Sequence, residues 1–187
     1  MAATCLQNQE DRPIRLIFQD EARFGRMSDP RACWAPAPKR PMVGLALVRE
    51  FKYEYVAVSP WSGDLDYMTS EKMTTENMSK FLKQVSETHE QDFMVMVLDG
   101  APSHKGKKLE VPENIALVFL PSYSPELNPA EQIWNLLRRD YFANRVFDSL
   151  NAAILQAEKG LANMASNREA LRKLTNWPWI SAILKAS

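Results

Sequence analysis

A chain of 187 residues, with 45% hydrophobic and 25% charged residues, has the size and composition of one globular domain. Its two cysteines are too few for a disulfide framework or a cysteine zinc site, and its two histidines exclude a histidine-rich metal site. Lysine plus arginine and aspartate plus glutamate each total 23, so the net charge of zero excludes nucleic-acid binding by bulk charge alone, though not through a local basic face. No apolar run reaches the ~18 residues of a membrane span and the start shows no signal-peptide pattern, so we expect a cytoplasmic protein with no membrane partner.

The first part of the chain contains three predicted strands. The apolar run 14–19 indicates a buried strand, and the runs 43–49 and 53–59 indicate two more. The polar residues 50–52 between the last two runs predict a hairpin turn. Residues 30–41 hold four prolines, which indicates a loop or an edge strand around 32–35.

The second part of the chain alternates predicted helices and strands. Apolar residues at positions 78, 81, 82 and 85 have helical spacing and predict a helix over 75–89. The remaining expected elements are buried strands at 93–98 and 115–120, helices at 129–142, 148–164 and 167–175, and a short helix from Pro178. This order predicts a mixed α/β sheet flanked by helices.

Three acidic residues stand where packing does not require an acid. Asp20 follows the first apolar run, Asp99 follows the run 93–98, and Glu131 lies in the first turn of the helix that starts at Pro129. The carboxyl ends of parallel strands form the ligand crevice of an α/β sheet, so these side chains would meet there. Carboxylates this close repel one another unless hard cations such as Mg²⁺ or Mn²⁺ lie between them. Two such ions can clamp the attacking and leaving oxygens of a phosphodiester, so the pattern indicates metal-dependent cutting or transfer of nucleic-acid strands.

Each of these acids also has a purely structural explanation. An aspartate after a strand is commonly a turn or cap residue. Asn128 is a good N-cap and Pro129 suits the first helical position, which would make Glu131 the acid of a capping box. Neighbouring strand residues point to opposite faces, so spacing alone does not choose between Asp20 and Glu21. If Glu131 is only a cap, Glu126 is the next candidate.

Four segments of the sequence match the motifs of one family. They are Phe18-Gln19-Asp20-Glu21-Ala22-Arg23-Phe24, Val97-Leu98-Asp99-Gly100-Ala101-Pro102-Ser103-His104, Leu120-Pro121-Ser122-Tyr123-Ser124-Pro125, and Glu126-Leu127-Asn128-Pro129-Ala130-Glu131 with its continuation to Trp134. The last two segments are continuous and highly specific, whereas the first alone is a weak signal. On these residues the chain resembles the catalytic domain of DDE transposases, in the superfamily that joins mariner-like elements to a group of bacterial insertion sequences.

The resemblance implies a ribonuclease-H-like fold, shared with retroviral integrases, with a mixed five-stranded sheet flanked by helices. It implies that Asp20, Asp99 and Glu131 form the catalytic triad and hold two Mg²⁺ or Mn²⁺ ions, and it selects Asp20 over Glu21. The implied reaction is hydrolysis of a phosphodiester at the end of a mobile element, followed by attack of the freed 3′-hydroxyl on target DNA. Many relatives have asparagine directly after the second aspartate, where this chain has Gly100.

The resemblance also implies partners. Full-length relatives carry helix-turn-helix modules before the catalytic domain and often act as dimers that hold two DNA ends. Only a short segment precedes the first predicted strand here, so we expect a truncation, one half of a split reading frame or a remnant. DNA is the expected partner, as element ends and target, together with a separate N-terminal helix-turn-helix region or polypeptide and a homodimer. The expected parts are a tail over 1–13, a catalytic domain over 14–146 and a helical extension over 147–187 packed on it.

Two groups of basic residues are candidates for DNA contact. One group, close after Asp99, comprises His104, Lys105, Lys107 and Lys108, and the other, on the helix of Glu131, comprises Arg138 and Arg139. A solvated surface explains the first group equally well, and the two arginines could simply pair with acids.

Two tryptophan features are expected to serve packing. Trp134 should fill the core beside its helix rather than stack on a base. Trp177-Pro178-Trp179 predicts a docking anchor for the last helix.

The leading interpretation is therefore an enzyme, a transposase catalytic domain that uses two divalent ions. The alternatives are an inactive or domesticated DNA-binding remnant, and a nuclease of the same fold with an unrelated substrate. The complete triad favours the enzyme, and the short N-terminal segment favours the remnant.

Overall fold

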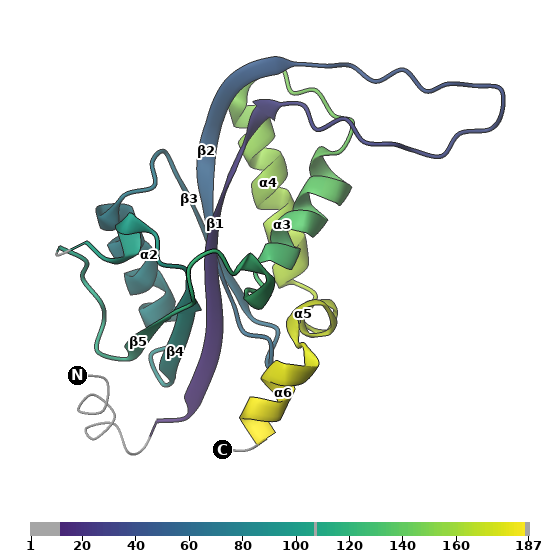
Figure 1. The fold of residues 1–187 in the computed structure, drawn as a ribbon. Helices are drawn as coiled ribbons and strands as arrows, with labels where there is room; N and C mark the ends of the chain where they lie inside the picture. The colour runs from purple at the N-terminus through teal and green to yellow at the C-terminus, as the bar shows by residue number, and fades with distance from the viewer. Residues whose placement is uncertain (1–11, 107, 186–187) are drawn as a thin grey trace.

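The computed structural model describes residues 12–106 and 108–185, which form one mixed sheet with helices on both faces (Figure 1). The strands are β1 (Ile14–Met27), β2 (Leu47–Val58), β3 (Leu65–Ser70), β4 (Phe93–Leu98) and β5 (Ile115–Phe119). Their order across the sheet is β3-β2-β1-β4-β5. β2 is antiparallel to both β1 and β3, whereas β4 is parallel to both β1 and β5. This arrangement confirms the predicted five-stranded α/β fold.

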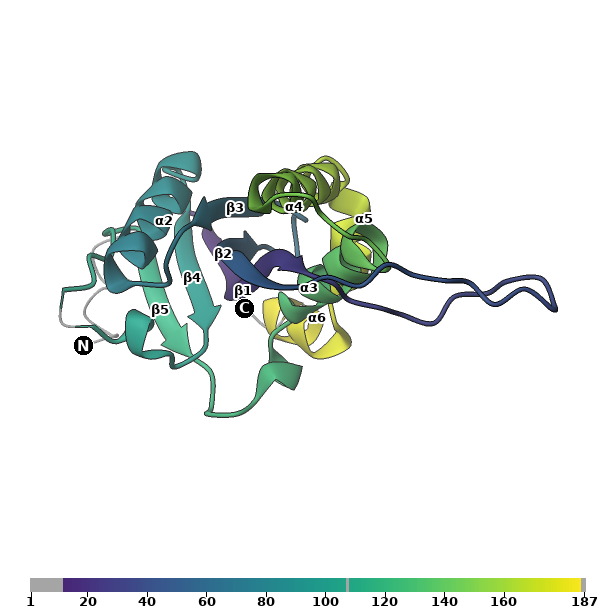
Figure 2. The same ribbon diagram turned by 90° about the horizontal axis from the view of Figure 1, so that it is seen from above.

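The two faces of the sheet carry separate cores, because successive residues of β1 point to opposite sides. Ile17 packs with Met78 and Phe81 of helix α2 (Thr75–Thr88). Phe18 belongs to the other core, which is covered by the remaining helices, as the view from above shows (Figure 2). These are α3 (Glu131–Leu137), α4 (Leu150–Ala165), α5 (Arg168–Thr175) and α6 (Pro178–Lys185).

The helices follow their predicted patterns closely. The buried residues of α2 are the four apolar positions that predicted the helix, and the hydroxyl of Thr74 caps its start by accepting from the N–H of Asn77. The predicted helix at 129–142 is α3 continued by a π-helical turn, Arg138–Phe142. None of the described helices is long and apolar enough to cross a membrane.

The C-terminal helices belong to the same core as the sheet. Gly160 lets α4 approach α3 closely, since an added Cβ would collide with a methyl group of Leu137. Trp179 packs edge-on against the ring of Phe18, with the ring centres 6.1 Å apart. The expected anchoring of the last helix is therefore confirmed.

Three expectations for the strands are wrong. β1 does not end at Gln19 but runs on to Met27, and β2 is one strand that passes straight through 50–52, where a hairpin turn was expected. The polar residues there lie on the exposed half of β2, which pairs with the far half of β1 and needs no apolar side chains. The edge strand β3 was not predicted at all. Five strands were expected and five are present, but they are not the same five.

The chain between β1 and β2, residues 28–46, forms a long arm that leaves the body of the protein (Figures 1 and 2). The expected loop is confirmed, without an edge strand at 32–35. Trp34 and Met42 are fully exposed on it. At the base of the arm, the backbone of Asp29 forms an isolated β-bridge with that of Ala143, and the N–H of Arg31 donates to the side chain of Asn144. The arm is thereby tied to the segment that follows the π-helical turn.

Candidate active site

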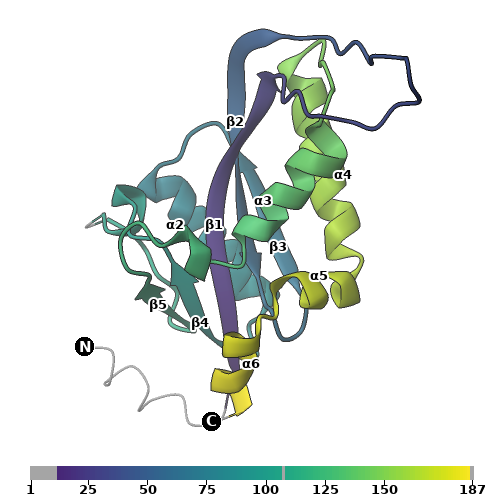
Figure 3. The same cartoon turned by 45° about the vertical axis from the view of Figure 1, so that its right-hand side comes forward.

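The three predicted acids lie on one groove at the edge of the sheet. Asp20 comes from β1, Asp99 from the end of β4, and Glu131 from the start of α3, and all three line a cavity of about 370 Å³. The segment 120–125, together with Gly100, Ala101 and Asn128, forms the rest of the wall. In Figure 3 the start of α3 lies beside β1, near the point where β4 ends. We call this cavity the acid groove.

We expected Asp20 to follow the end of the first strand. It lies instead inside β1, which continues to Met27. The pairing of β1 with the parallel strand β4 stops at Phe18 and Val97. Asp20 therefore lies two residues beyond the last β1 residue that pairs with β4. Its Oδ2 accepts a hydrogen bond of 2.8 Å from the indole nitrogen of Trp134. Burial, followed by the negative charge of Glu131, raises the pKa of Asp20 to about 7, and the Trp134 bond opposes this rise.

Asp99 is held at the mouth of the acid groove. Its Oδ1 accepts from the backbone N–H of Ala101 at 2.9 Å and lies 2.9 Å from Nδ1 of His104. Its side chain is 57% exposed. The hydrogen bond from His104 lowers the pKa of Asp99 and outweighs burial. Asp99 is therefore ionised at neutral pH, whereas Asp20 keeps its proton to a much higher pH than an ordinary aspartate.

Glu131 does not form the capping box that its sequence position suggested. A capping box needs the backbone N–H of Asn128, but this group donates to the carbonyl oxygen of Pro125 at 2.9 Å. The helix begins at Glu131 with Ala130 at its N-cap and no side-chain cap, and Asn128 lies before it, where its side-chain oxygen accepts from the N–H of Ala130 at 3.1 Å. The same side chain donates to the carbonyl oxygen of Gln19 at 3.0 Å, which fixes the start of α3 against β1 next to Asp20.

Glu21 and His104 form a buried pair on the opposite face of β1. Nε2 of His104 lies 2.7 Å from Oε1 of Glu21, and both side chains are almost completely buried. Burial lowers the pKa of His104, but its hydrogen bonds to Asp99 and Glu21 outweigh this and raise the pKa to about 10. The imidazolium thus joins β1 to the loop that carries Asp99.

This burial corrects the expected position of His104. It is 2% exposed and cannot touch a DNA phosphate, because its ring nitrogens are used inside the protein. Its supporting role was missed from sequence. The only signal was the occurrence of Glu21 and His104 inside the two motifs that carry the aspartates.

The donor atoms of the acid groove suit a hard cation. Among the described residues, no three His, Cys, Asp or Glu side chains are already close enough together to form a ready metal site. The charged side chains that line the groove are nevertheless all carboxylates, and burial, followed by the negative charge of Glu131, raises the pKa of Asp20. Mg²⁺ or Mn²⁺ between Asp20 and Glu131 would relieve this repulsion, so the residues fit such ions.

The predicted basic residues do not form one surface. Nζ of Lys105 lies over the ring of Phe119, at 5.2 Å from its centre, and close to Gly100 at the acid groove. Lys108 lines a different cavity, beside α2. Lys107 lies outside the described residues. Arg139 pairs with its neighbour Asp140 at 2.6 Å, whereas Arg138 turns to the ring of Phe24.

Comparisons with known proteins agree with this architecture. The chain is 32% identical over 128 residues to the uncharacterized protein y4pE/y4sA of Sinorhizobium fredii, a match that covers 68% of this chain and 87% of that protein. Its fold is similar to a pre-cleavage Mos1 transpososome, with a TM-score of 0.61, 11% identity and 97% of this chain covered. It is likewise similar to the Mos1 mariner paired-end complex with Mn, with a TM-score of 0.61, 13% identity and 90% coverage.

The chain spans 59% and 55% of the lengths of these two Mos1 chains, and at these identities the likeness shows the fold alone. The family comparison goes further. A model described as DDE superfamily endonuclease matches residues 15–154, which include all three acids of the groove. The chain belongs to the DDE superfamily endonuclease family.

Proposed function

We propose that this chain is the catalytic domain of a transposase, which cleaves DNA strands and transfers them with the help of two Mg²⁺ or Mn²⁺ ions. The single observation that carries the proposal is that Asp20, Asp99 and Glu131, from three separate segments, line one groove. Membership of the endonuclease family supports the same conclusion.

Each acid has a separate role in this proposal. Asp20 and Glu131 both line the groove, where the charge of Glu131 acts on Asp20, and they would hold cations between their oxygens. Asp99 would contribute its free oxygen, since Oδ1 is already used by Ala101 and His104. When bound, the ions supply positive charge to the attacking and leaving oxygens of a phosphodiester. A water molecule is the nucleophile for cleavage, and the freed 3′-hydroxyl is the nucleophile for transfer to target DNA.

The proposed partners are DNA, as element ends and target, a second copy of the chain, and a helix-turn-helix region or polypeptide that recognises the ends. The titles of the Mos1 structures describe paired-end and strand-transfer complexes of that protein, which supports a paired assembly here. The arm 28–46, with its exposed Trp34 and Met42, offers a surface for self-association. Light scattering with and without DNA tests this part of the proposal.

Nicking of a supercoiled plasmid tests the cleavage step. The wild-type chain should nick in Mg²⁺ or Mn²⁺ and not in EDTA. Glu131→Gln should fold normally and lose cleavage, because glutamine matches the shape of glutamate but has no charge for the cation. Glu126→Gln is the matched control, since Glu126 is an exposed neighbour that does not line the groove. Normal cleavage by Glu131→Gln together with a loss in Glu126→Gln would move the third acid to Glu126.

Strand transfer separates a transposase from the two alternatives. A duplex that ends in a 3′-hydroxyl and carries an element end should be joined to a second DNA, whereas a random duplex should not. A nuclease of the same fold would cleave both duplexes equally and join neither. A remnant would bind both and do nothing further.

A further inference from the structure

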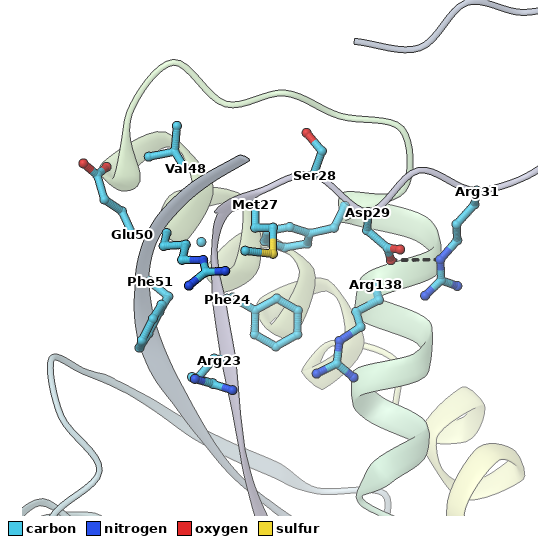
Figure 4. A pocket seen from close by; sticks show the side chains of 13 residues that line it. Arg23, Phe24, Met27, Ser28, Asp29, Arg31, Val48, Glu50, Phe51 and Arg138 are labelled. Carbon is cyan, nitrogen blue, oxygen red and sulfur yellow. Dashed lines mark hydrogen bonds and ion pairs between the residues drawn. The ribbon is translucent and has the colours of Figure 1, made fainter. Parts of the chain in front are cut away.

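A second cavity lies beyond the acid groove and is lined by arginines (Figure 4). Its volume is about 720 Å³, and it lies among the far half of β1, the exposed half of β2, the start of the π-helical turn and the base of the arm. The arginines of its wall are Arg23, Arg31, Arg49 and Arg138. We call this cavity the arginine pocket.

Its charge is only partly balanced. Asp29 forms an ion pair with Arg31, and Glu50 forms one with Arg26, which lies outside the lining. Within the described part of the chain, no carboxylate pairs with Arg23, Arg49 or Arg138. The pocket therefore presents three arginines without a carboxylate partner, of which Arg23 and Arg49 are exposed to solvent, and a wall of this charge attracts anions.

Two of these arginines rest on aromatic rings. The guanidinium of Arg138 lies 5.3 Å from the centre of the Phe24 ring, and that of Arg23 lies 5.1 Å from the centre of the Phe51 ring. Figure 4 shows Arg138 reaching from its helix toward Phe24. A guanidinium stacked on a ring keeps the N–H groups in its plane free to donate, and this fork suits the oxygens of a phosphate.

The arginine pocket continues the line of the acid groove along two elements at once. Arg138 is seven residues after Glu131, which is about two helical turns and ~10 Å along the same face of the helix. Arg23 is three residues after Asp20, which is also ~10 Å along an extended strand, and because this number is odd its side chain leaves β1 on the opposite face from Asp20 and lines the pocket from that side. Since α3 runs beside β1, both estimates describe the same displacement (Figure 3).

We propose that the arginine pocket binds backbone phosphates of the DNA strand whose cleaved bond lies in the acid groove, with Arg138 and Arg23 on its two sides. This subsite rests on the proposed function for its substrate, but the charge, the stacking and the cavity are properties of the pocket alone. Arg23 and Arg138 are its binding residues. Arg139 is paired with Asp140 and does not line the pocket, so it is not a binding residue.

Binding without metal gives the direct test. The probe is a fluorescein-labelled 30-base-pair duplex of random sequence, titrated by anisotropy in EDTA over a range of NaCl concentrations. Loss of one phosphate contact should flatten the salt dependence by about 0.9 and weaken binding about eightfold at 0.1 M salt. Arg23→Gln and Arg138→Gln should each show this change.

Arg139→Gln is the matched control, since it removes the same charge from the neighbouring position. It should leave both the affinity and the salt slope near wild type. Equal losses in Arg138→Gln and Arg139→Gln would overturn the subsite in favour of a general charge effect. Unchanged binding in Arg23→Gln and Arg138→Gln, or no binding by wild type up to ~10⁻⁴ M, would also overturn it.

Two further variants separate charge from geometry. Arg138→Lys keeps the positive charge but lacks the planar fork, so the salt slope should stay while the affinity falls. Phe51→Leu keeps every charge and removes the ring beneath Arg23, so it should weaken binding less than Arg23→Gln does. Full affinity in Arg138→Lys would overturn the forked contact that the geometry requires. Both variants also guard against misfolding as a cause of lost binding.

Cleavage assays distinguish failure of the subsite from failure of the proposed function. Arg23→Gln and Arg138→Gln should raise the DNA concentration needed for half-maximal nicking and leave the rate at saturation unchanged. If wild type never cleaves but the arginine variants still lose binding in EDTA, the subsite stands and the nuclease proposal fails. If wild type cleaves and the arginine variants match it at every DNA concentration, the subsite fails and the nuclease proposal stands.

Discussion

The indole nitrogen of Trp134 donates to the carboxylate of Asp20 across 2.8 Å, from the second turn of α3 to the middle of β1. Trp134 is 1% exposed and packs in the core, as was expected, but its polar edge is aimed at the first acid of the groove. A packing residue of the helix thus also stabilises the ionised form of Asp20, in opposition to the larger effect of burial on its pKa.

Trp134→Phe should weaken metal binding while the fold is kept. Phenylalanine fills most of the same space, but the pKa of Asp20 then rises further, because the stabilising hydrogen bond is lost. We expect the midpoint of Mg²⁺-induced thermal stabilisation to rise roughly tenfold, as for other residues that orient metal ligands. Trp179→Phe, a change in a packing tryptophan beside Phe18, is the control and should keep the wild-type midpoint. An unshifted midpoint in Trp134→Phe would contradict this role.

Asp20→Asn and Asp99→Asn should change stability in opposite directions when metal is absent. Folded Asp20 keeps its proton up to about pH 7, whereas in the unfolded chain it loses it near pH 3.8, so its ionisation makes the folded state less stable as the pH rises between these values. Asp20→Asn should therefore raise the unfolding free energy at pH 8 by at most about 4 kcal/mol, with the difference vanishing near pH 4. Asp99→Asn removes a partner of the His104 imidazolium and should lower stability. Denaturant titrations in EDTA at both pH values measure the two effects.

His104→Gln should flatten the dependence of stability on alkaline pH. The pKa of His104 is 6.5 in its ordinary state and about 10 in the fold, so its contribution is complete below pH 6.5 and is lost as the pH rises toward 10. The variant should be less stable at pH 7 by about 3 kcal/mol, the typical cost of breaking a buried ion pair. His89→Gln, which touches Asp66 elsewhere in the structure, is the control for removing an imidazole. A wild-type pH profile in His104→Gln would show that the buried pair is not ionised.

Lys105→Ala and Lys108→Ala should separate the two lysines that sequence placed in one patch. Lys105 lies at the acid groove, so its loss should weaken binding of a labelled duplex and flatten the salt dependence by about 0.9. Lys108 lines the cavity beside α2, away from the groove, so its loss should change neither. Equal effects of the two variants would mean that DNA covers both faces.

The acid groove was largely predictable because each of its acids is tied to a local sequence signal. Asp99 follows a fully apolar run, and Glu131 follows the Asn128-Pro129 start of a helix, and both signals work over a few residues. The choice of Asp20 over Glu21 came from the family motif, and the structure gives its physical basis. Asp20 faces α3 and the groove, whereas Glu21 faces the buried His104.

Contacts between distant segments were not predictable from the same signals. Glu21 and His104, which form the buried pair, are 83 residues apart in the sequence. Nothing in the sequence distinguishes these two side chains from exposed ones. The arginine pocket likewise brings Arg23 and Arg138 together only because α3 packs beside β1. Their stacking partners come from the same half of β1 and β2, which carries no clear strand pattern.

The sequence alone determined those elements whose hydrophobic pattern is local: α2 from its four buried apolar positions, and β4 and β5 from unbroken apolar runs. Only the tertiary structure decided that β1 continues past Asp20, that 50–52 is strand and not turn, and that β3 completes the sheet. These segments are held by backbone hydrogen bonds to a partner strand, and such bonds leave no trace in side-chain hydrophobicity. Because the paired residues are 7 to 17 positions apart in β2 and β3 and 20 to 40 positions apart in β1 and β2, the effect of the partner strand becomes visible only when the chain is folded.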